Sequence, residues 1–252
     1  MDWAQTFYAT QFDLLDGPGA WEIQREHREI ALSVQALTVP SARVLELGAG
    51  GGQVAAALAD LGYDVVAIEL LPVVAARAQN LASSPRPGMM TVLQGDFYEI
   101  ELEGTFDVVC YWDGFGIGSD ADQRALLRRI HEWLTPSGHA LIEVYTPWYW
   151  AQAAGRTMTV GRAARRYDFD GRGCRMLDTW WSEADSASTV TQSLRCYAPA
   201  DLELLLEGTG LHLVRVTPGG CYDAETGRYE GDAPLERAMS YVAMLAAASW
   251  AD

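Results

Sequence analysis

Glycines at alternate positions carry the first candidate chemistry in this 252-residue chain. The strand predicted at Val44–Leu47 leads directly into Gly48, Gly50 and Gly52. Glycine permits positive φ and lets a ligand approach the main chain closely. The helix expected at Gln53–Leu61 points its free N–H groups and its partial positive charge at the bound group. The segment therefore predicts a tight turn that binds a carboxylate or a phosphate.

A carboxylate follows at the distance expected for a ligand that contains ribose. The strand predicted at Asp64–Ile68 ends just before Glu69, which lies 21 positions after Gly48. An acid about 20 residues after such glycines is placed to accept hydrogen bonds from both ribose hydroxyls. The turn, the acid and the strand context together are much more specific than the glycines alone.

The glycine segment resembles the first motif of the class I S-adenosylmethionine (SAM)-dependent methyltransferases. In that family an acid precedes glycines at alternating positions, and Glu46-x-Gly48-x-Gly50-x-Gly52 matches this pattern. The fingerprint of nicotinamide dinucleotides would need a small residue where this chain has Gln53. A nicotinamide-dependent oxidoreductase is therefore the weaker alternative.

The resemblance extends, at lower specificity, over about residues 44–145 and 197–216, and it implies a set of cofactor contacts. By this resemblance, Glu46 anchors the glycine turn near the amino acid end of SAM, Glu69 holds the ribose, and Leu70 flanks the adenine. The segment 94–97 resembles the motif that meets the adenine amino group and ring. The implied cofactor is SAM, with S-adenosylhomocysteine as its product, and the implied contacts are Tyr8, Glu46, Gly48, Ala49, Gly50, Gly52, Glu69, Leu70, Gly95, Asp96, Phe97, Trp112 and Phe115.

Several of these residues also have a purely structural interpretation. For Asp96 the structural alternative, less favoured than cofactor contact, is capping of a turn or a helix. Trp112 and Phe115 follow the strand predicted at 106–111, where an aromatic face would attract the cationic sulfonium, but both can also pack in the core. Tyr8 has the helical spacing of a packing residue, and it reaches the cofactor only when the N-terminal helix closes over it.

An aromatic cluster marks the expected acceptor side. The predicted strand His139–Tyr145 runs into a segment rich in Trp and Tyr, which indicates either an apolar pocket or hydrophobic packing beneath a small antiparallel unit. Adjacent residues on a strand face opposite sides, so one member of the Trp180-Trp181 pair is expected to face the sheet or the pocket. The predicted acceptor contacts are Trp148, Tyr149, Trp150 and Trp180.

Methyl transfer itself requires few catalytic groups. The acceptor must lie in line with the S–CH3 bond in a dry pocket, and an acceptor that loses a proton can need a base. The candidates are Asp113, Tyr145 and His27, of which His27 is also typical of a solvated helix histidine. A site with almost no base would suit an amine acceptor.

The elements around these residues predict an α/β fold. Strands and helices alternate between residues 44 and 145, which is typical of a Rossmann-like, mostly parallel sheet with helices on both faces. We expect seven strands, with 211–216 and 241–246 forming an antiparallel C-terminal edge. A small antiparallel insertion follows strand five, and its three predicted strands are Thr157–Phe169, Cys174–Ser182 and Thr189–Tyr197.

These elements are expected to form a single domain over residues 1–252. We divide it into an N-terminal helical cap at 1–40, a cofactor-binding core at 41–150, an insertion on the substrate side at 151–197, and the C-terminal end of the sheet at 198–252.

The amino-acid composition disfavours some classes of binding partner. There are 18 Lys and Arg residues against 34 Asp and Glu residues, so the formal charge is −16. Nucleic-acid binding depends on basic side chains, so it is disfavoured; the acidity favours solubility or the attraction of cationic substrates. The four cysteines form no C-x-x-C pair, so no metal site is predicted. Without a signal-peptide pattern or a membrane-spanning run, we expect a cytoplasmic enzyme, monomeric or homodimeric, with a small-molecule substrate.

The leading hypothesis is methyl transfer from SAM to an N or O atom of a small molecule. One alternative keeps SAM as a cofactor for a cyclisation or another rearrangement without methylation. A second alternative is a SAM-binding module without catalytic activity.

Overall fold

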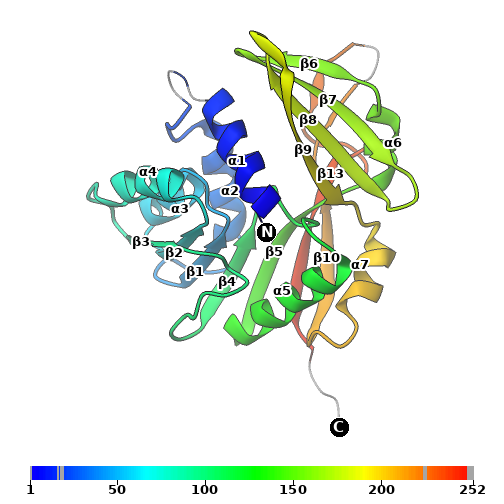
Figure 1. Ribbon diagram of the computed structural model, residues 1–252. Coiled ribbons are helices and arrows are strands. Elements are labelled where there is room, and N and C mark those ends of the chain that lie inside the picture. The colour runs from blue at the N-terminus through cyan, green and yellow to red at the C-terminus, as the bar shows by residue number, and fades with distance from the viewer. Residues whose placement is uncertain (1, 16, 18–19, 224–225, 249–252) are drawn as a thin grey trace.

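A seven-stranded sheet forms the centre of the molecule, which we describe from a computed structural model (Figure 1). The structure describes residues 2–15, 17, 20–223 and 226–248. The strands of the sheet are β1 (Arg43–Leu47), β2 (Asp64–Glu69), β3 (Met89–Gln94), β4 (Phe106–Tyr111), β5 (Leu134–Tyr145), β10 (Leu211–Pro218) and β13 (Ser240–Ala247).

The order of these strands is β10-β13-β5-β4-β1-β2-β3. Strands β1 to β5 pair in parallel, whereas β13 pairs antiparallel with both β5 and β10. The predicted mostly parallel sheet with an antiparallel C-terminal edge is thereby confirmed. The strand order reverses between β1 and β4, and ligands of such sheets bind beyond the carboxyl ends of the strands at that point.

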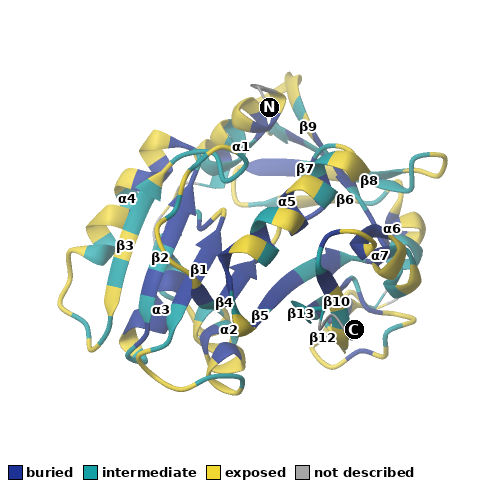
Figure 2. Ribbon diagram, turned by 90° about the horizontal axis from the view of Figure 1, so that it is seen from below, coloured by how far each residue is buried: buried dark blue, intermediate teal, exposed yellow. Residues whose placement is uncertain are grey.

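Helices cover both faces of the sheet because its strands are apolar on both sides. On one face α2 (Arg25–Gln35), α3 (Gln53–Asp60) and α4 (Pro72–Ala82) lie together, and on the other α5 (Asp120–Trp133) lies beside α7 (Pro199–Leu206). Figure 2 shows the central strands buried between these two layers. No helix in the described part of the chain is long and apolar enough to cross a membrane.

The insertion after β5 is an antiparallel sheet of four strands, in the order β6-β7-β8-β9. The predicted single strand Thr157–Phe169 is wrong. A tight turn at Gly161-Arg162, with Gly161 at φ 61°, divides that segment into two strands. Two-residue hairpin loops with positive φ connect antiparallel strands in this way. The strands are β6 (Thr157–Val160), β7 (Ala163–Asp170), β8 (Arg175–Ser182) and β9 (Asp185–Arg195).

Three further elements complete the fold. The N-terminal helix α1 (Asp2–Leu15) contacts β8 and β9, and in Figure 1 it lies between the large sheet and the insertion. A short helix α6 (Pro147–Ala153) follows β5 directly, with Pro147 in its first turn, where the fixed φ of proline suits a helix start. The hairpin of β11 (Cys221–Tyr222) and β12 (Tyr229–Glu230) was not predicted.

Candidate active site

A cavity of about 710 Å³ lies at the carboxyl ends of the parallel strands. Its walls come from the ends of β1, β2, β4 and β5, from α1 and α2, and from the insertion. The fold therefore brings together residues as far apart in the sequence as Ala4 and Ser240. Of the residues predicted from the sequence, those that line it are Tyr8, His27, Glu46, Gly48, Ala49, Gly50, Glu69, Leu70, Asp96, Phe97, Trp112, Asp113, Tyr145, Trp150 and Trp180.

Three residues predicted to contact the cofactor do not line this cavity. Phe115 is 1% exposed, and its ring centroid lies 5.7 Å from that of Tyr197. It therefore packs in the core, which was the structural alternative to a cofactor contact. A Cβ at Gly52 would lie 2.8 Å from the Ala78 side chain, so that glycine lets α3 pack against α4. Gly95 packs beside Ile100.

Two of the four predicted acceptor contacts are also displaced from the cavity. Trp148 donates its indole N–H to the Leu235 carbonyl at 2.9 Å, and Tyr149 packs edge-on against Trp150. Only Trp150 of this segment lines the cavity. The segment forms α6, and helical spacing turns its neighbouring side chains in different directions.

The glycine turn has the backbone that its sequence predicts. Gly48, Gly50 and Gly52 have φ values of 62°, 55° and 80°. The carboxylate of Glu69 accepts the Gly50 N–H at 2.9 Å through one oxygen and the Leu71 N–H at 2.8 Å through the other. Glu69 is 6% exposed, and this burial raises its pKa. It therefore ties the glycine turn to the end of β2, with lone pairs left for a ligand.

Glu46 supplies the most direct test of whether a cationic ligand fits the part of the cavity beside the glycine turn. Its side chain is only 3% exposed, and its Oε2 atom has no hydrogen-bond partner among the described residues. Burial raises the pKa of Glu46 to about 8. A buried oxygen without a partner is costly, and the ammonium of an amino acid ligand would satisfy it.

Asp96 caps a turn and also lines the cavity. Its Oδ1 atom accepts the Tyr98 N–H at 2.8 Å, which caps the turn after β3, and the residue also lines the cavity. The ring of Phe97 lies 5.4 Å from that of Tyr111, centroid to centroid. This part of the wall offers a flat apolar surface beside one carboxylate.

A four-residue network joins the ends of β4, β5 and β13 on the acceptor side. Tyr145 donates its hydroxyl to Asp113 Oδ1, and the Asp113 N–H donates to Glu143 Oε2 at 3.3 Å. The Ser240 hydroxyl donates to Glu143 Oε1 at 2.7 Å. Asp113 has φ 49°, a left-handed conformation that Asp tolerates better than most residues. Glu143 and Ser240 were not predicted from the sequence, although a single acid in the mostly apolar strand β5 is a usable signal.

The surroundings of this network shift the pKa values of Tyr145 and Glu143. Burial, together with the charges of Asp113 and Glu143, raises the pKa of Tyr145 well above its ordinary value, so its phenol stays protonated and acts as a donor. Burial, together with the Asp113 charge, also raises the pKa of Glu143. Asp113 is exposed and lines the cavity.

An arginine stacked between two aromatic rings forms the far wall. Arg165 lies with its Cζ 4.3 Å from the Trp180 ring centroid and 4.6 Å from that of Tyr167. Its guanidinium pairs with Asp178, which is 1% exposed and also accepts the Trp180 indole N–H at 2.8 Å. Trp150 adds a further ring, 4.8 Å from Tyr167. The wall is apolar and rigid, and its one cation is already neutralised.

The N-terminal helices close the remaining sides. The Tyr8 hydroxyl accepts a hydrogen bond from the Gln192 amide of β9, while Phe7 is buried beside Trp180. His27 of α2 accepts the Gln24 N–H at its Nδ1 atom, at 2.9 Å, and burial lowers its pKa. Tyr8 of α1 thus lines the cavity in this structure.

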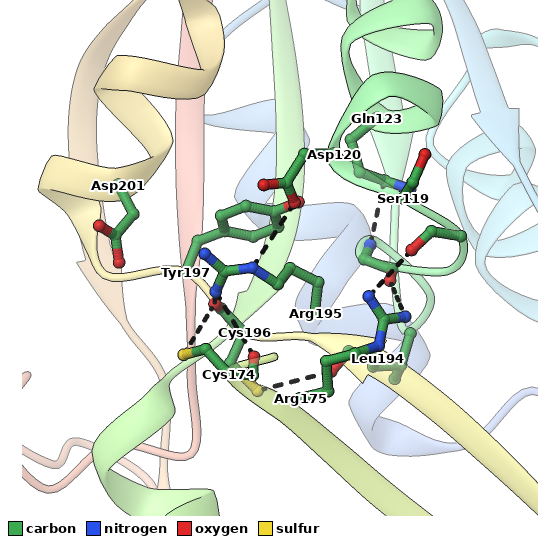
Figure 3. A network of polar contacts seen from close by, with 12 residues as sticks. Ser119, Asp120, Gln123, Cys174, Arg175, Leu194, Arg195, Cys196, Tyr197 and Asp201 are labelled. Atoms are coloured by element: carbon green, nitrogen blue, oxygen red, sulfur yellow. Dashed lines mark hydrogen bonds and ion pairs between the residues drawn. The ribbon is translucent and has the colours of Figure 1, made fainter. Parts of the chain in front are cut away.

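Two arginines of the insertion, Arg175 and Arg195, hold the loop between β4 and α5, to which Asp113 belongs, through the backbone carbonyls of that loop (Figure 3). Arg175 of β8 donates to the carbonyls of Gly118 at 2.9 Å and Gly116 at 3.1 Å. The N–H of Arg195 also donates to the Gly116 carbonyl, and its guanidinium lies 3.5 Å from Asp120. These bonds fix the insertion relative to the carboxyl end of β4.

Comparison with known proteins agrees with this geometry. Residues 21–216 match the family model described as a methyltransferase domain. The curated relatives include the cypemycin N-terminal methyltransferase of a Streptomyces species, 30% identical over 46% of this chain and 47% of that protein. A protein-L-isoaspartate O-methyltransferase of Gloeobacter violaceus is 37% identical over 27% of this chain. These alignments span about half and a third of the relatives' own lengths.

Solved structures resemble the chain over nearly its full length. The CcbJ methyltransferase of Streptomyces caelestis is 25% identical, with a TM-score of 0.75 over 98% of both chains. The glycopeptide N-methyltransferase MtfA, solved in complex with SAM, is 23% identical, with a TM-score of 0.61 over 88% of this chain and 87% of that one. The chain therefore belongs to the methyltransferase-domain family and has the class I fold of SAM-dependent methyltransferases.

Proposed function

We propose that this protein transfers the methyl group of SAM to a nitrogen atom of a small cationic acceptor, and that Asp113 receives the proton which this nitrogen loses. One observation carries the proposal: the acceptor half of the cavity presents the carboxylates of Asp113 and Glu143, and neither has a cationic partner among the described residues. Unpaired carboxylates at a ligand wall attract cations.

The charge balance of the whole cavity supports an amine rather than an acidic acceptor. Among the described residues, six carboxylates line it, against the single guanidinium of Arg165, which Asp178 already neutralises. Glu46, Glu69 and Asp96 belong to the half that fits the cofactor, where the glycine turn and an unpartnered buried oxygen suit a zwitterionic nucleoside. Asp113 and Glu143 remain for the acceptor.

The reaction needs little from the chain beyond positioning and one proton transfer. SAM supplies an electrophilic methyl group on a sulfonium. Asp113 takes the ammonium proton of the acceptor, the freed nitrogen lone pair forms the new N–CH3 bond, and the electron pair of the broken S–CH3 bond stays on sulfur. Tyr145 holds the Asp113 carboxylate through its hydroxyl, and Trp150 and Trp180 exclude water from the acceptor side.

An acceptor screen with a matched variant tests this proposal. The protein is incubated with SAM and paired small amines and alcohols of the same carbon skeleton, and products are identified by mass spectrometry. Methylation of amines is expected; methylation confined to the alcohols, or products of unchanged mass, would contradict the proposal.

Asp113→Asn then tests the proton acceptor, because Asn tolerates the same left-handed backbone. We expect kcat/KM for an amine to fall by about 100-fold or more, the scale of general-base catalysis, with binding of S-adenosylhomocysteine unchanged. The control is Asp232→Asn, an exposed acid outside the cavity. Equal activity of the two variants would remove Asp113 from the mechanism.

A further inference from the structure

Two side chains with N–H groups, Trp112 and His27, line the side of the cavity that α2 covers. The indole Nε1 of Trp112 is buried and has no hydrogen-bond partner among the described residues. His27 also lines the cavity. A buried donor without a partner costs free energy, so this corner is expected to receive an acceptor atom when the cavity is filled.

The tautomer of His27 follows from its position in α2. Because Nδ1 accepts the Gln24 N–H, the proton of the neutral imidazole is on Nε2. Burial lowers the pKa of His27, which favours this neutral form. No described residue accepts a hydrogen bond from Nε2. His27 therefore faces the cavity with a single N–H donor and cannot use Nδ1 as a base without breaking the helix cap.

The packing places the two donors on the same side of the sheet. His27 shares a helical face with Ala31 and Val34, which are buried against α3, and Trp112 packs in the same cluster. The first residues of α3, Gln53 and Val54, also line the cavity there. The corner thus combines two side-chain N–H groups with the positive end of a helix, and such a combination selects an anionic oxygen.

The described lining residues of this corner include no Lys or Arg that could bind the same anionic oxygen. Among the described lining residues the one arginine is Arg165, and it belongs to the insertion and pairs with Asp178. A carboxylate in this half of the cavity therefore has neutral donors as its partners. The unpartnered Oε2 of Glu46 also lines this half, and it is suited to an ammonium.

We propose that Trp112 Nε1–H and His27 Nε2–H bind the carboxylate of the amino acid part of the cofactor, which makes His27 a cofactor-binding residue instead of a base. This inference rests on the proposed use of SAM. It assigns the amino acid part to the α2 side of the glycine turn and the nucleoside to Glu69 and Asp96. The chemical class of ligand is an α-amino carboxylate joined to a nucleoside.

A pair of ligands separates this role from a general effect on the cavity. S-adenosylhomocysteine carries the carboxylate, whereas 5′-methylthioadenosine has the same nucleoside and thioether without the amino acid part. Binding of both is measured by titration calorimetry on the full chain. Trp112→Phe removes only the N–H, and His27→Glu keeps an acceptor for the Gln24 N–H, as a capping box allows, while placing a negative charge in the corner.

Each of these variants is expected to weaken S-adenosylhomocysteine about tenfold or more and to leave methylthioadenosine within about twofold. His27→Gln, which keeps both an acceptor and a donor, is expected to bind nearly as wild type. Ser33→Glu adds the same charge to an exposed position of α2 and serves as the control.

The outcomes distinguish this inference from the proposed function. If the wild type binds S-adenosylhomocysteine and the variants bind it equally well, the carboxylate assignment is wrong and the proposed function stands. Equal losses for both ligands would also overturn it, because they indicate a distorted cavity. If the wild type binds neither ligand, the proposed use of SAM itself fails.

Discussion

Glu69→Gln tests the link between the glycine turn and the ribose site. The wild-type carboxylate accepts two backbone N–H groups, from Gly50 and Leu71, one on each oxygen. A glutamine side chain of the same shape has one carbonyl oxygen, so its amide would face the second N–H with a donor. The substitution removes the charge, one backbone hydrogen bond and acceptor capacity for the ribose, while leaving the volume unchanged.

The magnitude follows from those losses. A hydrogen bond to a charged group contributes about 1.5–3 kcal/mol, so one lost backbone bond at a site that is 6% exposed should lower the free energy of unfolding by about 2 kcal/mol. Loss of one charged acceptor for a ribose hydroxyl adds a binding penalty of the same size, which corresponds to a Kd about 10 to 150 times higher.

Urea unfolding and calorimetric titration with S-adenosylhomocysteine measure the two effects separately. Glu99→Gln is the control, because Glu99 is an exposed acid in the loop after β3. The reasoning is refuted if Glu69→Gln binds within about threefold of wild type, which lies inside the spread of a single weak contact. A drop in stability with unchanged affinity would restrict Glu69 to holding the turn.

Two further substitutions test the buried carboxyl of Glu46 and the hydrogen bonds by which Arg175 holds the insertion to the loop after β4. Burial raises the pKa of Glu46 to about 8 from an ordinary 4.5, so the unfolded carboxyl ionises first and wild-type stability should decline from about pH 4.5 to about pH 8. Glu46→Gln should therefore show little change in melting temperature at pH 5 and an increase at pH 8; a constant difference would contradict this. Arg175→Met removes four hydrogen bonds, to Gly116, Gly118 and both oxygens of Ser193, and should lower the free energy of unfolding by about 2–4 kcal/mol in urea titrations. The exposed Arg172→Met is its control, and equal stability of the two would show that the loop is held by other contacts.

The cofactor half was predictable because its chemistry is local. Gly48, Gly50 and Gly52 show their backbone requirement in their residue type, and Glu69 follows one helix and one strand later. The parallel order of β1, β2 and β4 then places those segments at one edge of the sheet. Short-range pattern and a general rule for parallel sheets were enough to assemble that half of the cavity.

The acceptor half was not predictable in the same way, because its groups meet only through tertiary packing. Arg165 and Asp178 pair across the β7–β8 hairpin, a contact that depends on strand register. The Gly161-Arg162 turn, missed in the sequence, changes where that hairpin begins. A shift of one residue would turn Arg165 away from the cavity.

The aromatic residues after β5 were also only partly predictable from the sequence. Their types indicate a pocket, but their directions depend on whether the segment is extended or helical. Pro147 in the first turn of α6 starts a helix, so Trp150 lines the cavity while Trp148 bonds to the Leu235 carbonyl. Residue types can therefore indicate an apolar pocket. Which of those side chains line it depends on whether the segment is a helix or a strand, and seven residues are too few for the sequence pattern to show this.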